Sequence, residues 1–404
     1  MIGSFIVDGL RTPIGRLGGS LSSVRTDDLA AMVIKKLTER FEDIPPDRYD
    51  DVILGCANQS GEDNRNVSRM ALLLAGLPWS VPGETVNRLC ASGMSAVIHA
   101  HRAIVAGDGD LFISGGVEHM TRGPWVISKA SSPFGRDSEM YDSSFGWRFI
   151  NPQMKALYGT DSMGETAENL VRLYKISRED QDNFALWSHQ KATAALSKGR
   201  FSKEIMPVSI NQKKSEGYIF SEDEFIRPKT TIQALADLKP VFRSIENGGS
   251  VTAGNASGLN DGAAAILVAS TAAVKNYNLK PLARIVASGV IGVEPAHMGI
   301  GPVGATEVAL RKASLSLGDM DIIELNEAFA GQVLACTRQW RLDDDDPRLN
   351  PNGGAIALGH PLGMSGARIL LTASLELNIR KEKYALVTMC IGVGQGYAVI
   401  IERA

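Results

Sequence analysis

The sequence predicts an α/β protein in which sheets are covered by helices. Short apolar runs, typical of buried strands, alternate with longer segments of helical periodicity. A similar order of elements recurs after about residue 280. Between about residues 123 and 249 this alternation is interrupted by a stretch that is richer in charged, aromatic and turn-forming residues.

In the first part of the chain, strands and helices are expected in alternation. The predicted strands are Phe5–Val7, Val52–Leu54, Glu84–Leu89 and Leu111–Ser114. The predicted helices are Asp27–Glu39, Val67–Ala75 and Met94–Val105.

In the second part, the predicted strands are Ala283–Ala287, Ile322–Leu325, Gly354–Leu358, Ala385–Met389 and Tyr397–Ile401. The predicted helices are Ala305–Ser316, Ala328–Arg338 and Ser365–Leu377. The two parts can be overlaid by element order, which places Cys90 and His360 where a strand leads into a helix. Any doubly wound protein shows some repetition of this kind, so the pattern alone leaves both interpretations open.

The interrupting stretch is interpreted as a lid-like domain inserted between two strands of the first half, because long irregular insertions are usually functional. We therefore expect an N-terminal half at 1–122 and 250–275, an inserted loop domain at 123–249, and a C-terminal half at 276–404.

Composition limits the classes of function. The chain has 404 residues and a formal net charge of -3, so it offers no basic surface for nucleic acid or anionic lipid. No apolar run reaches the roughly 20 residues that a bilayer requires, and no signal-like segment precedes the first strand. The four cysteines are scattered, without metal-ligand spacing, and this favours reduced thiols. We expect a soluble, cytoplasmic protein without bound metal.

Cys90 is the first candidate for chemistry. It lies in ETVNRLCASGMSAV, where a β-rich run leads through small residues into a helical pattern. Backbone N–H groups at a helix N-terminus favour thiolate and lower a cysteine pKa. A buried structural cysteine is the alternative.

His360 lies in NPNGGAIALGHPLGMSGAR, on a glycine-flanked turn before a helix. Such a turn suits a base that takes a proton from a thiol. The other five histidines, including His99 and His101, are interpreted as structural.

Cys390 ends the predicted strand YALVTMC and precedes IGVGQG, whose backbone N–H groups could form an oxyanion site. Because a strand and not a helix follows, this is no dinucleotide-binding motif. Asn326, in IIELNEAFAG, is a further polar group at a strand end.

These segments resemble the thiolase family over essentially the whole chain. VNRLCASGM is similar to the family's nucleophile signature, NPNGGAIALGHPLGMSGAR to its histidine signature, and CIGVGQGYAVIIE to its C-terminal cysteine signature. NEAFA, GGVEHM, MGETAEN and VTAGNASGLNDGAA are also typical thiolase stretches. The resemblance implies the thiolase fold, with two similar βαβαβαββ halves in a layered αβαβα arrangement plus the inserted loop domain.

The resemblance also implies a role for each residue. Cys90 would attack a 3-oxoacyl thioester and carry the acyl group, and His360 would activate it. Cys390 would act as general acid and base at the α-carbon of acetyl-CoA. His360 and a water on Asn326 would stabilise the thioester oxyanion, while the N–H groups of Cys90 and Gly392 would form a second oxyanion hole. Such covalent catalysis is ping-pong.

No resident cofactor is implied, since coenzyme A is a co-substrate. The resemblance implies that CoA lies over the inserted domain, and the residues expected along its path are Ser257, Ala253, Met163, Arg227 and Phe242. An ordinary surface charge is an equal interpretation of Arg227.

One position departs from acetoacetyl-specific thiolases, which carry His before the MG of MGxTAEN where this chain has Ser162. The smaller residue suggests a roomier acyl pocket. GCANQSGEDNRNVSRMALLLAGLP and FGWRFINPQM resemble 3-oxoadipyl-CoA thiolases. Their substrate ends in a carboxylate, for which Arg148 is a hypothetical partner, and a surface arginine that packs the lid is the alternative.

Three alternatives remain at this point. The chain could be a general 3-ketoacyl-CoA or acetoacetyl-CoA thiolase, or a non-catalytic CoA- or lipid-carrier protein on the same fold. Oxidation could also join Cys90 and Cys390 as a regulatory disulfide. Family resemblance further implies a homodimer or homotetramer.

Overall fold

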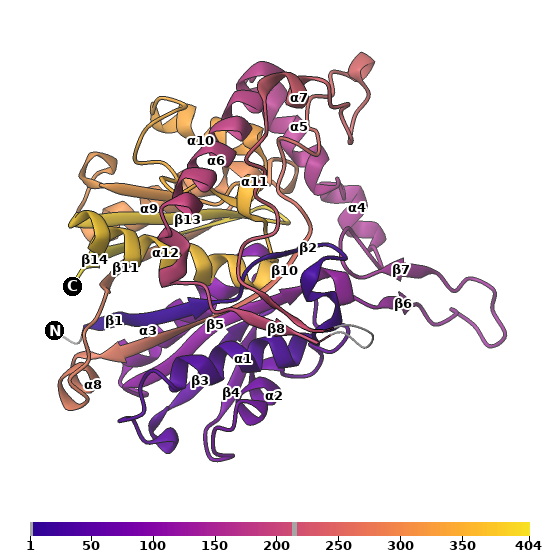
Figure 1. Cartoon of the computed structure of the whole chain (residues 1–404). Coiled ribbons are helices and arrows are strands. Elements are labelled where there is room, and N and C mark those ends of the chain that lie inside the picture. The colour runs from indigo at the N-terminus through magenta and orange to yellow at the C-terminus, as the bar shows by residue number, and fades with distance from the viewer. Residues whose placement is uncertain (1–2, 212–215) are drawn as a thin grey trace.

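The structure is a computed structural model that describes residues 3–211 and 216–404. Within these residues, a mixed ten-stranded sheet runs through the molecule (Figure 1). Its first stretch has the order β1 (Ser4–Arg11), β10 (Asn260–Ser270), β5 (Leu111–His119), β3 (Asp51–Gly55) and β4 (Gly83–Val86), and β2 (Gly15–Arg16) pairs with β10. Its second stretch has the order β11 (Ala283–Gly292), β14 (Gln395–Arg403), β13 (Tyr384–Ile391) and β12 (Ile322–Leu325).

The two stretches repeat the same strand directions. In each, the first two pairings are antiparallel and the pairing that follows is parallel. They join through β1 and β11, where Phe5 pairs with Arg284 and Ile6 with Ala283. The predicted repetition of element order is therefore confirmed, with β1, β10, β5 and β3 equivalent to β11, β14, β13 and β12.

Helices complete a five-layered α–β–α–β–α arrangement. α3 (Ser92–Ala106) and α12 (Leu362–Arg380) lie between the two stretches, as side chains from both pack with them in one core. α1 (Thr26–Thr38) and α2 (Val67–Leu74) cover the outer face of the first stretch. α9 (Gly301–Ala313) and α10 (Ala330–Trp340) cover that of the second. α8 (Thr271–Asn276) follows β10.

The alternation of side chains along the strands explains the layers. In β10, Ile266 and Val268 face the central core, whereas Ala265 and Leu267 face the outer one. A strand that is buried on both faces is apolar throughout, which is why these strands appear as continuous apolar runs. The segment Leu89–Ala106 is long and apolar enough to cross a bilayer, but most of it is buried inside the protein as the α3 region.

The chain between β5 and β10 contains smaller elements. They are β6 (Trp125–Ile127), β7 (Met140–Asp142), α4 (Pro152–Tyr158), α5 (Met163–Leu173), α6 (Arg178–Ser197), β8 (Val208–Ile210), β9 (Tyr218–Phe220) and α7 (Ile232–Ala236). β5 and β10 are neighbours in the sheet, so the chain leaves and re-enters at adjacent strands. The hairpin of β6 and β7 projects from the body of the molecule (Figure 1).

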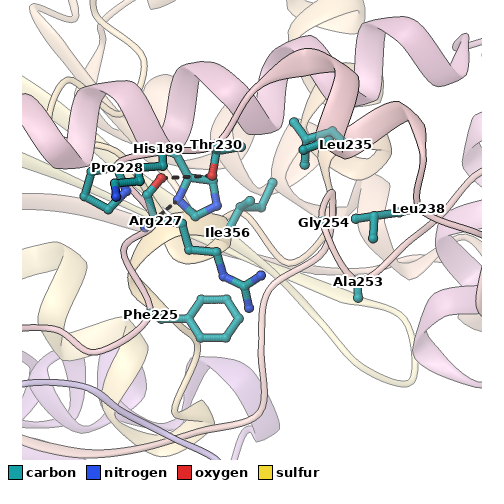
Figure 2. Close-up of a pocket in the computed structure, with 12 residues that line it drawn as sticks. His189, Phe225, Arg227, Pro228, Thr230, Leu235, Leu238, Ala253, Gly254 and Ile356 are labelled. Carbon is teal, nitrogen blue, oxygen red and sulfur yellow. Dashed lines mark hydrogen bonds between the residues drawn. The ribbon is translucent and has the colours of Figure 1, made fainter.

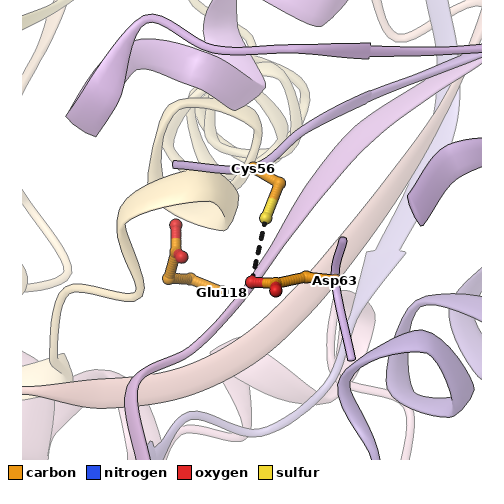
Figure 3. Close-up of side chains that lie close together, drawn as sticks. All are labelled: Cys56, Asp63 and Glu118. Atoms are coloured by element: carbon orange, nitrogen blue, oxygen red, sulfur yellow. Dashed lines mark hydrogen bonds between the residues drawn. The ribbon is translucent and has the colours of Figure 1, made fainter. Parts of the chain in front are cut away.

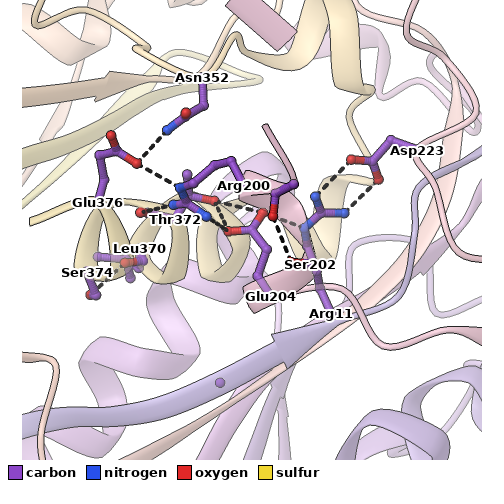
Figure 4. A network of polar contacts seen from close by, with 12 residues as sticks. Arg11, Arg200, Ser202, Glu204, Asp223, Asn352, Leu370, Thr372, Ser374 and Glu376 are labelled. Carbon is purple, nitrogen blue, oxygen red and sulfur yellow. Dashed lines mark hydrogen bonds and ion pairs between the residues drawn. The ribbon is translucent and has the colours of Figure 1, made fainter. Parts of the chain in front are cut away.

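A buried network of charges fastens this long segment to the core (Figure 4). Arg11 of β1 donates two hydrogen bonds to Asp223, at 2.6 and 2.8 Å, and one to Glu204 at 2.9 Å. Arg200 donates to Glu376 of α12 at 2.7 Å. The network therefore links the segment between β5 and β10 to a strand of the first half and a helix of the second.

One predicted strand is wrong, and another ends earlier than predicted. The predicted strand Gly354–Leu358 is a short helix, α11 (Ala355–Leu358), because the buried carboxylate of Glu327 accepts the N–H of Ile356 at 3.1 Å and caps the helix start. The predicted strand Glu84–Leu89 ends early, since β4 stops at Val86 and Leu89 has a left-handed φ of 46°.

Candidate active site

Cys90 lies in a 3-10 turn, Leu89–Ala91, directly before α3. The left-handed φ of Leu89 is unfavourable for a residue with a branched side chain, and such strain is common at functional sites. The thiol is partly buried. This placement at the start of a helix matches the expected one.

The pKa of the Cys90 thiol differs from the expected one. Burial raises the pKa of the thiol to about 11, while the backbone N–H groups of Gly392 and of Cys90 itself act in the opposite direction. The expected lowering of the pKa is therefore outweighed by desolvation. With this pKa the Cys90 thiol is neutral at pH 7, so a role as nucleophile would require a base.

His360 is held as a neutral base. It follows α11 rather than a strand and precedes α12. Burial lowers the pKa of the imidazole to about 3, with a further lowering by the charge of Arg368. Nδ1 lies 2.6 Å from Oγ of Ser365, and this hydroxyl donates to the carbonyl oxygen of Pro361 at 2.8 Å.

These contacts favour one tautomer of His360. With its proton donated to the carbonyl oxygen of Pro361, the Ser365 hydroxyl accepts the Nδ1–H of the imidazole. Nε2 then carries a lone pair, and it lies 3.4 Å from Nδ2 of Asn326. The backbone N–H of His360 also donates to Asn260 at 2.9 Å, which fixes the turn.

Asn326 comes directly after β12, and its backbone N–H donates to Thr388 of β13 at 3.0 Å. Its side chain is buried, and Oδ1 has no hydrogen-bond partner among the described residues. A buried amide oxygen with a free lone pair suits an ordered water.

Cys390 lies on β13 and is fully buried. Burial raises the pKa of its thiol well above the usual range, and Cys90 adds to this effect, which places the two sulfurs in the same environment. Gly392 begins the turn between β13 and β14. A methyl group added to Gly392 would lie 3.3 Å from Leu89 and 3.5 Å from the sulfur of Met163. The glycine therefore leaves the space beside Cys90 open.

A cavity of about 570 Å³ lies at the segment between β5 and β10 (Figure 2). Arg227 and Ala253 line it, as do Phe225, Leu235 and His189. Arg227 stacks over the ring of Phe225, 5.3 Å from its centroid. Cys90, Asn326, His360 and Cys390 are not part of its lining.

The other three residues expected along the CoA path lie nearer Cys390. Met163 packs on a cluster that contains Cys390, Ala328 and Phe329. Phe242 meets Phe329 edge-on, with ring centroids 6.3 Å apart. The N–H of Ser257 donates to Ala328 at 2.9 Å. The predicted CoA residues thus divide between the cavity and the surroundings of Cys390.

His189, which is expected to be structural, forms part of the cavity wall with its side chain. Its Nδ1 accepts the backbone N–H of Arg227 at 3.3 Å, and burial, followed by the charge of Arg227, lowers its pKa to about 4. His189 lies in the middle of α6, and only the folding of the loop around Arg227 brings it to the cavity. No local sequence signal could have indicated this.

Cys56, Asp63 and Glu118 form a buried cluster of potential metal ligands (Figure 3). Their oxygens, however, already accept hydrogen bonds. The donors to Asp63 are Gly61, Gln59 and the thiol of Cys56, and the donors to Glu118 are the N–H groups of Ala57, Asn58 and Gly363. Burial also raises the pKa of Cys56 well above its usual range, which disfavours the thiolate that a metal requires. The cluster is suited to holding backbone in place.

Comparisons with known proteins agree with this geometry. The family model for the thiolase N-terminal domain matches residues 4–272, and that for the thiolase C-terminal domain matches residues 279–403. This chain belongs to the thiolase family, and it is an acyltransferase of that family.

Among its relatives is the 3-oxoadipyl-CoA/3-oxo-5,6-dehydrosuberyl-CoA thiolase of Escherichia coli K12. The two are 59% identical over 400 residues, which is 99% of both chains. The beta-ketoadipyl-CoA thiolase of Acinetobacter baylyi is 56% identical, also over 99% of both. The crystal structure of human mitochondrial 3-ketoacyl-CoA thiolase in complex with CoA matches with a TM-score of 0.91 and 42% identity, and covers 100% of this chain and 98% of that one. The predicted family and fold are confirmed.

Proposed function

We propose that this thiolase cleaves 3-oxoadipyl-CoA with CoA to give acetyl-CoA and succinyl-CoA. The observation that carries the proposal is the 56–59% identity, over the full length, to relatives named for this substrate. Ser162 supports it, because it caps α5 with a short side chain beside Met163 and leaves more room than histidine for a longer acyl chain.

The geometry supports a mechanism in which neutral groups exchange protons. Nε2 of His360 takes the proton of Cys90 as the sulfur attacks the 3-oxo carbon. The carbon–carbon bond then breaks, and the thiol of Cys390 protonates the departing acetyl-CoA at its α-carbon. Cys390 next takes the proton of incoming CoA, whose sulfur attacks the acyl-Cys90 thioester and releases the acyl-CoA product, while the protonated His360 returns its proton to Cys90.

Two groups of hydrogen-bond donors would stabilise the negative charge that develops. The N–H groups of Cys90 and Gly392, which already lower the pKa of the thiol, are placed for the oxyanion at the 3-oxo carbon. Once His360 is protonated, its Nε2–H faces the thioester oxygen of the departing acetyl-CoA, together with a water on Oδ1 of Asn326. Charge is thus stabilised only as it forms.

The substrate proposal is tested by measuring CoA-dependent cleavage of 3-oxoadipyl-CoA, acetoacetyl-CoA and a longer 3-oxoacyl-CoA side by side, with Cys90→Ser as control. We expect the largest kcat/KM on 3-oxoadipyl-CoA and no activity in the variant. A preference for acetoacetyl-CoA or for the longer 3-oxoacyl-CoA would make that compound the substrate in place of 3-oxoadipyl-CoA. Absence of cleavage with all three would favour a carrier protein.

CoA is proposed to lie along the cavity of Arg227 and Ala253 and to reach the cysteines past Ser257, Met163 and Phe242. The cavity combines an apolar wall with one stacked cation, which suits an adenine nucleotide end. Replacing Ala253 by Phe should fill the cavity and raise the Kd for CoA. An unchanged Kd, measured calorimetrically, would place CoA elsewhere.

We further propose that 123–249 is an inserted CoA-binding domain, with the halves at 1–122 plus 250–275 and at 276–404.

A cytoplasmic homodimer or homotetramer is proposed. The projecting β6–β7 hairpin supports association, since Trp125 and Ile127 are 70% and 66% exposed and Phe134 lies fully in solvent. Light scattering of the wild type and of Phe134→Asp tests this. A lower mass in the variant is expected, and a monomeric wild type would contradict it.

A further inference from the structure

Arg148 is a partly buried cation that is held by neutral groups. Its Nη1 donates to the carbonyl oxygen of Ser143 at 3.2 Å. Its Nη2 donates to Oδ1 of Asn58 at 3.1 Å, to the carbonyl oxygen of Asn58 at 3.4 Å and to Oγ of Ser60 at 3.3 Å. Nε takes part in none of these bonds, and within the described residues no carboxylate forms an ion pair with this guanidinium. Arginine has five N–H donors, so Arg148 retains both charge and donors for an anion.

The position of Arg148 is set by its neighbours. Residues 57–60 form the loop that holds Arg148. In this loop the carbonyl oxygen of Ala57 accepts a hydrogen bond from Nδ2 of Asn87 at 3.0 Å. Asn87 is three residues before Cys90. On the other side, the indole of Trp147 donates to Asp161 at 3.0 Å, directly before Ser162 and Met163. Arg148 therefore contacts a loop that is bonded to Asn87, and its neighbour in the chain, Trp147, is bonded to the start of the Ser162–Met163 segment.

The buried carboxylate of Glu118 connects this loop to the His360 turn. It accepts the N–H groups of Ala57 at 3.0 Å and Asn58 at 3.1 Å, and that of Gly363 at 2.9 Å. Gly363 is three residues after His360. One side chain thus fixes the loop of Asn58 relative to the His360 turn.

Resting on the proposed function, we propose that Arg148, oriented by Asn58 and Ser60, forms the subsite that binds the terminal carboxylate of the acyl chain, and that Glu118 is the positioning residue of this subsite. In a 3-oxoadipyl chain, three carbon–carbon bonds separate the keto carbon from the carboxylate carbon. A cation for that carboxylate must lie close to the nucleophile, which is where the loop of Asn58 is held. Nε–H and one N–H of Nη1 take part in none of the bonds above, so each is free to donate to a carboxylate oxygen.

The test compares two substrates of equal chain length, 3-oxoadipyl-CoA and 3-oxohexanoyl-CoA, in which a methyl group replaces the carboxylate. For Arg148→Met we expect kcat/KM on 3-oxoadipyl-CoA to fall on the order of 10- to 100-fold, the value of a hydrogen-bonded charge. Activity on 3-oxohexanoyl-CoA should change by less than about threefold. Arg148→Lys, which keeps the charge but not the directed N–H groups of the guanidinium, should recover part of the loss. The matched control is Arg172→Met, an exposed arginine of α5.

The outcomes separate this subsite from the proposed function. Equal losses on both substrates, or no loss on 3-oxoadipyl-CoA, would overturn the subsite while leaving the enzyme a 3-oxoadipyl-CoA thiolase. A wild type that does not cleave 3-oxoadipyl-CoA would instead overturn the proposed function. Thermal unfolding of each variant identifies a loss of activity that arises from misfolding. The ratio of kcat/KM on the two substrates, measured in the folded enzyme, then distinguishes the outcomes.

Glu118 is tested by the same ratio. Glu118→Gln replaces one acceptor oxygen by a donor that faces a backbone N–H. We expect kcat to fall on both substrates, because the His360 turn loosens, and the preference for 3-oxoadipyl-CoA also to shrink, because the Asn58 loop loosens. A fall in kcat with an unchanged preference would show that the loop is positioned without Glu118.

Discussion

Gly93 of α3 and Gly363 of α12 bring the backbones of the two central helices into contact. A methyl group built on Gly93 would lie only 2.5 Å from the carbonyl oxygen of Gly363. Cys90 and His360 lie just before these glycines in the sequence. The absence of a side chain at Gly93 therefore allows the helix ends that carry Cys90 and His360, the proposed nucleophile and base, to meet.

Gly93→Ala should consequently lower both stability and activity. The methyl group must push backbone aside, and such overpacking costs about 1–3 kcal/mol of unfolding free energy. Denaturant unfolding and kcat measure the two effects. Gly318→Ala is the control, because its nearest neighbour would be a side-chain oxygen at 3.6 Å. Equal stability of both variants would contradict the close contact.

Ser365→Ala should reduce turnover without unfolding the protein. Without the hydroxyl, Nδ1 of His360 loses the partner that keeps the proton on Nδ1. General acid–base catalysis contributes roughly 10²–10⁴-fold to a reaction rate. We expect Ser365→Ala to lose part of this contribution, so that kcat falls by about 10- to 100-fold. Ser374→Ala on the same helix, where the hydroxyl donates to Leu370 at 2.7 Å, should leave kcat unchanged.

Alkylation of Cys90 by iodoacetamide should accelerate steadily with pH. Burial raises the pKa of the thiol to about 11, so the reactive thiolate grows about tenfold per pH unit between pH 7 and 9. A preformed thiolate–imidazolium pair would instead react at a constant rate over this range. Mass spectrometry of the labelled peptide provides the rate, with Cys90→Ser to correct for the other cysteines. A plateau would show that the neutral pair is not the resting state.

Arg11→Ala should lower the free energy of unfolding strongly. The carboxylates of Glu204 and Asp223 would remain buried without their shared partner, which costs about 3–5 kcal/mol. The matched control is Arg284→Ala, whose ion pair with Glu402 is partly exposed and contributes at most about 1 kcal/mol. Urea unfolding compares the two, and similar losses would mean that solvent reaches Arg11.

The sequence predicted most of the layered fold, because strands buried on both faces are apolar throughout and helices repeat their apolar positions. The strands of β12, β13 and β14 were located in this way. Gly354–Leu358 was predicted to be a strand by the same reasoning, yet a distant carboxylate, that of Glu327, caps it as a helix. Short apolar runs do not distinguish the two structures.

The candidate active site, too, could be predicted only in part from the sequence. Segments with Cys90, His360, Asn326 and Cys390 could be recognised because each combines a reactive group with small residues and a turn. The pKa of Cys90 could not be predicted, since it depends on burial by segments far along the chain. Glu118 and His189 were missed as members of a site for the same reason, because their partners become neighbours only in the folded protein.

The repetition of the two halves has a consequence for how such a site can arise. Cys90 precedes α3 in the first half, and His360 precedes α12 at the equivalent place in the second. A symmetric pair of identical halves would carry the same side chain at both places, either two thiols or two imidazoles. Joining the halves in one chain, from β10 through α8 to β11, removes this constraint, so that one copy can supply the proposed nucleophile and the other the proposed base.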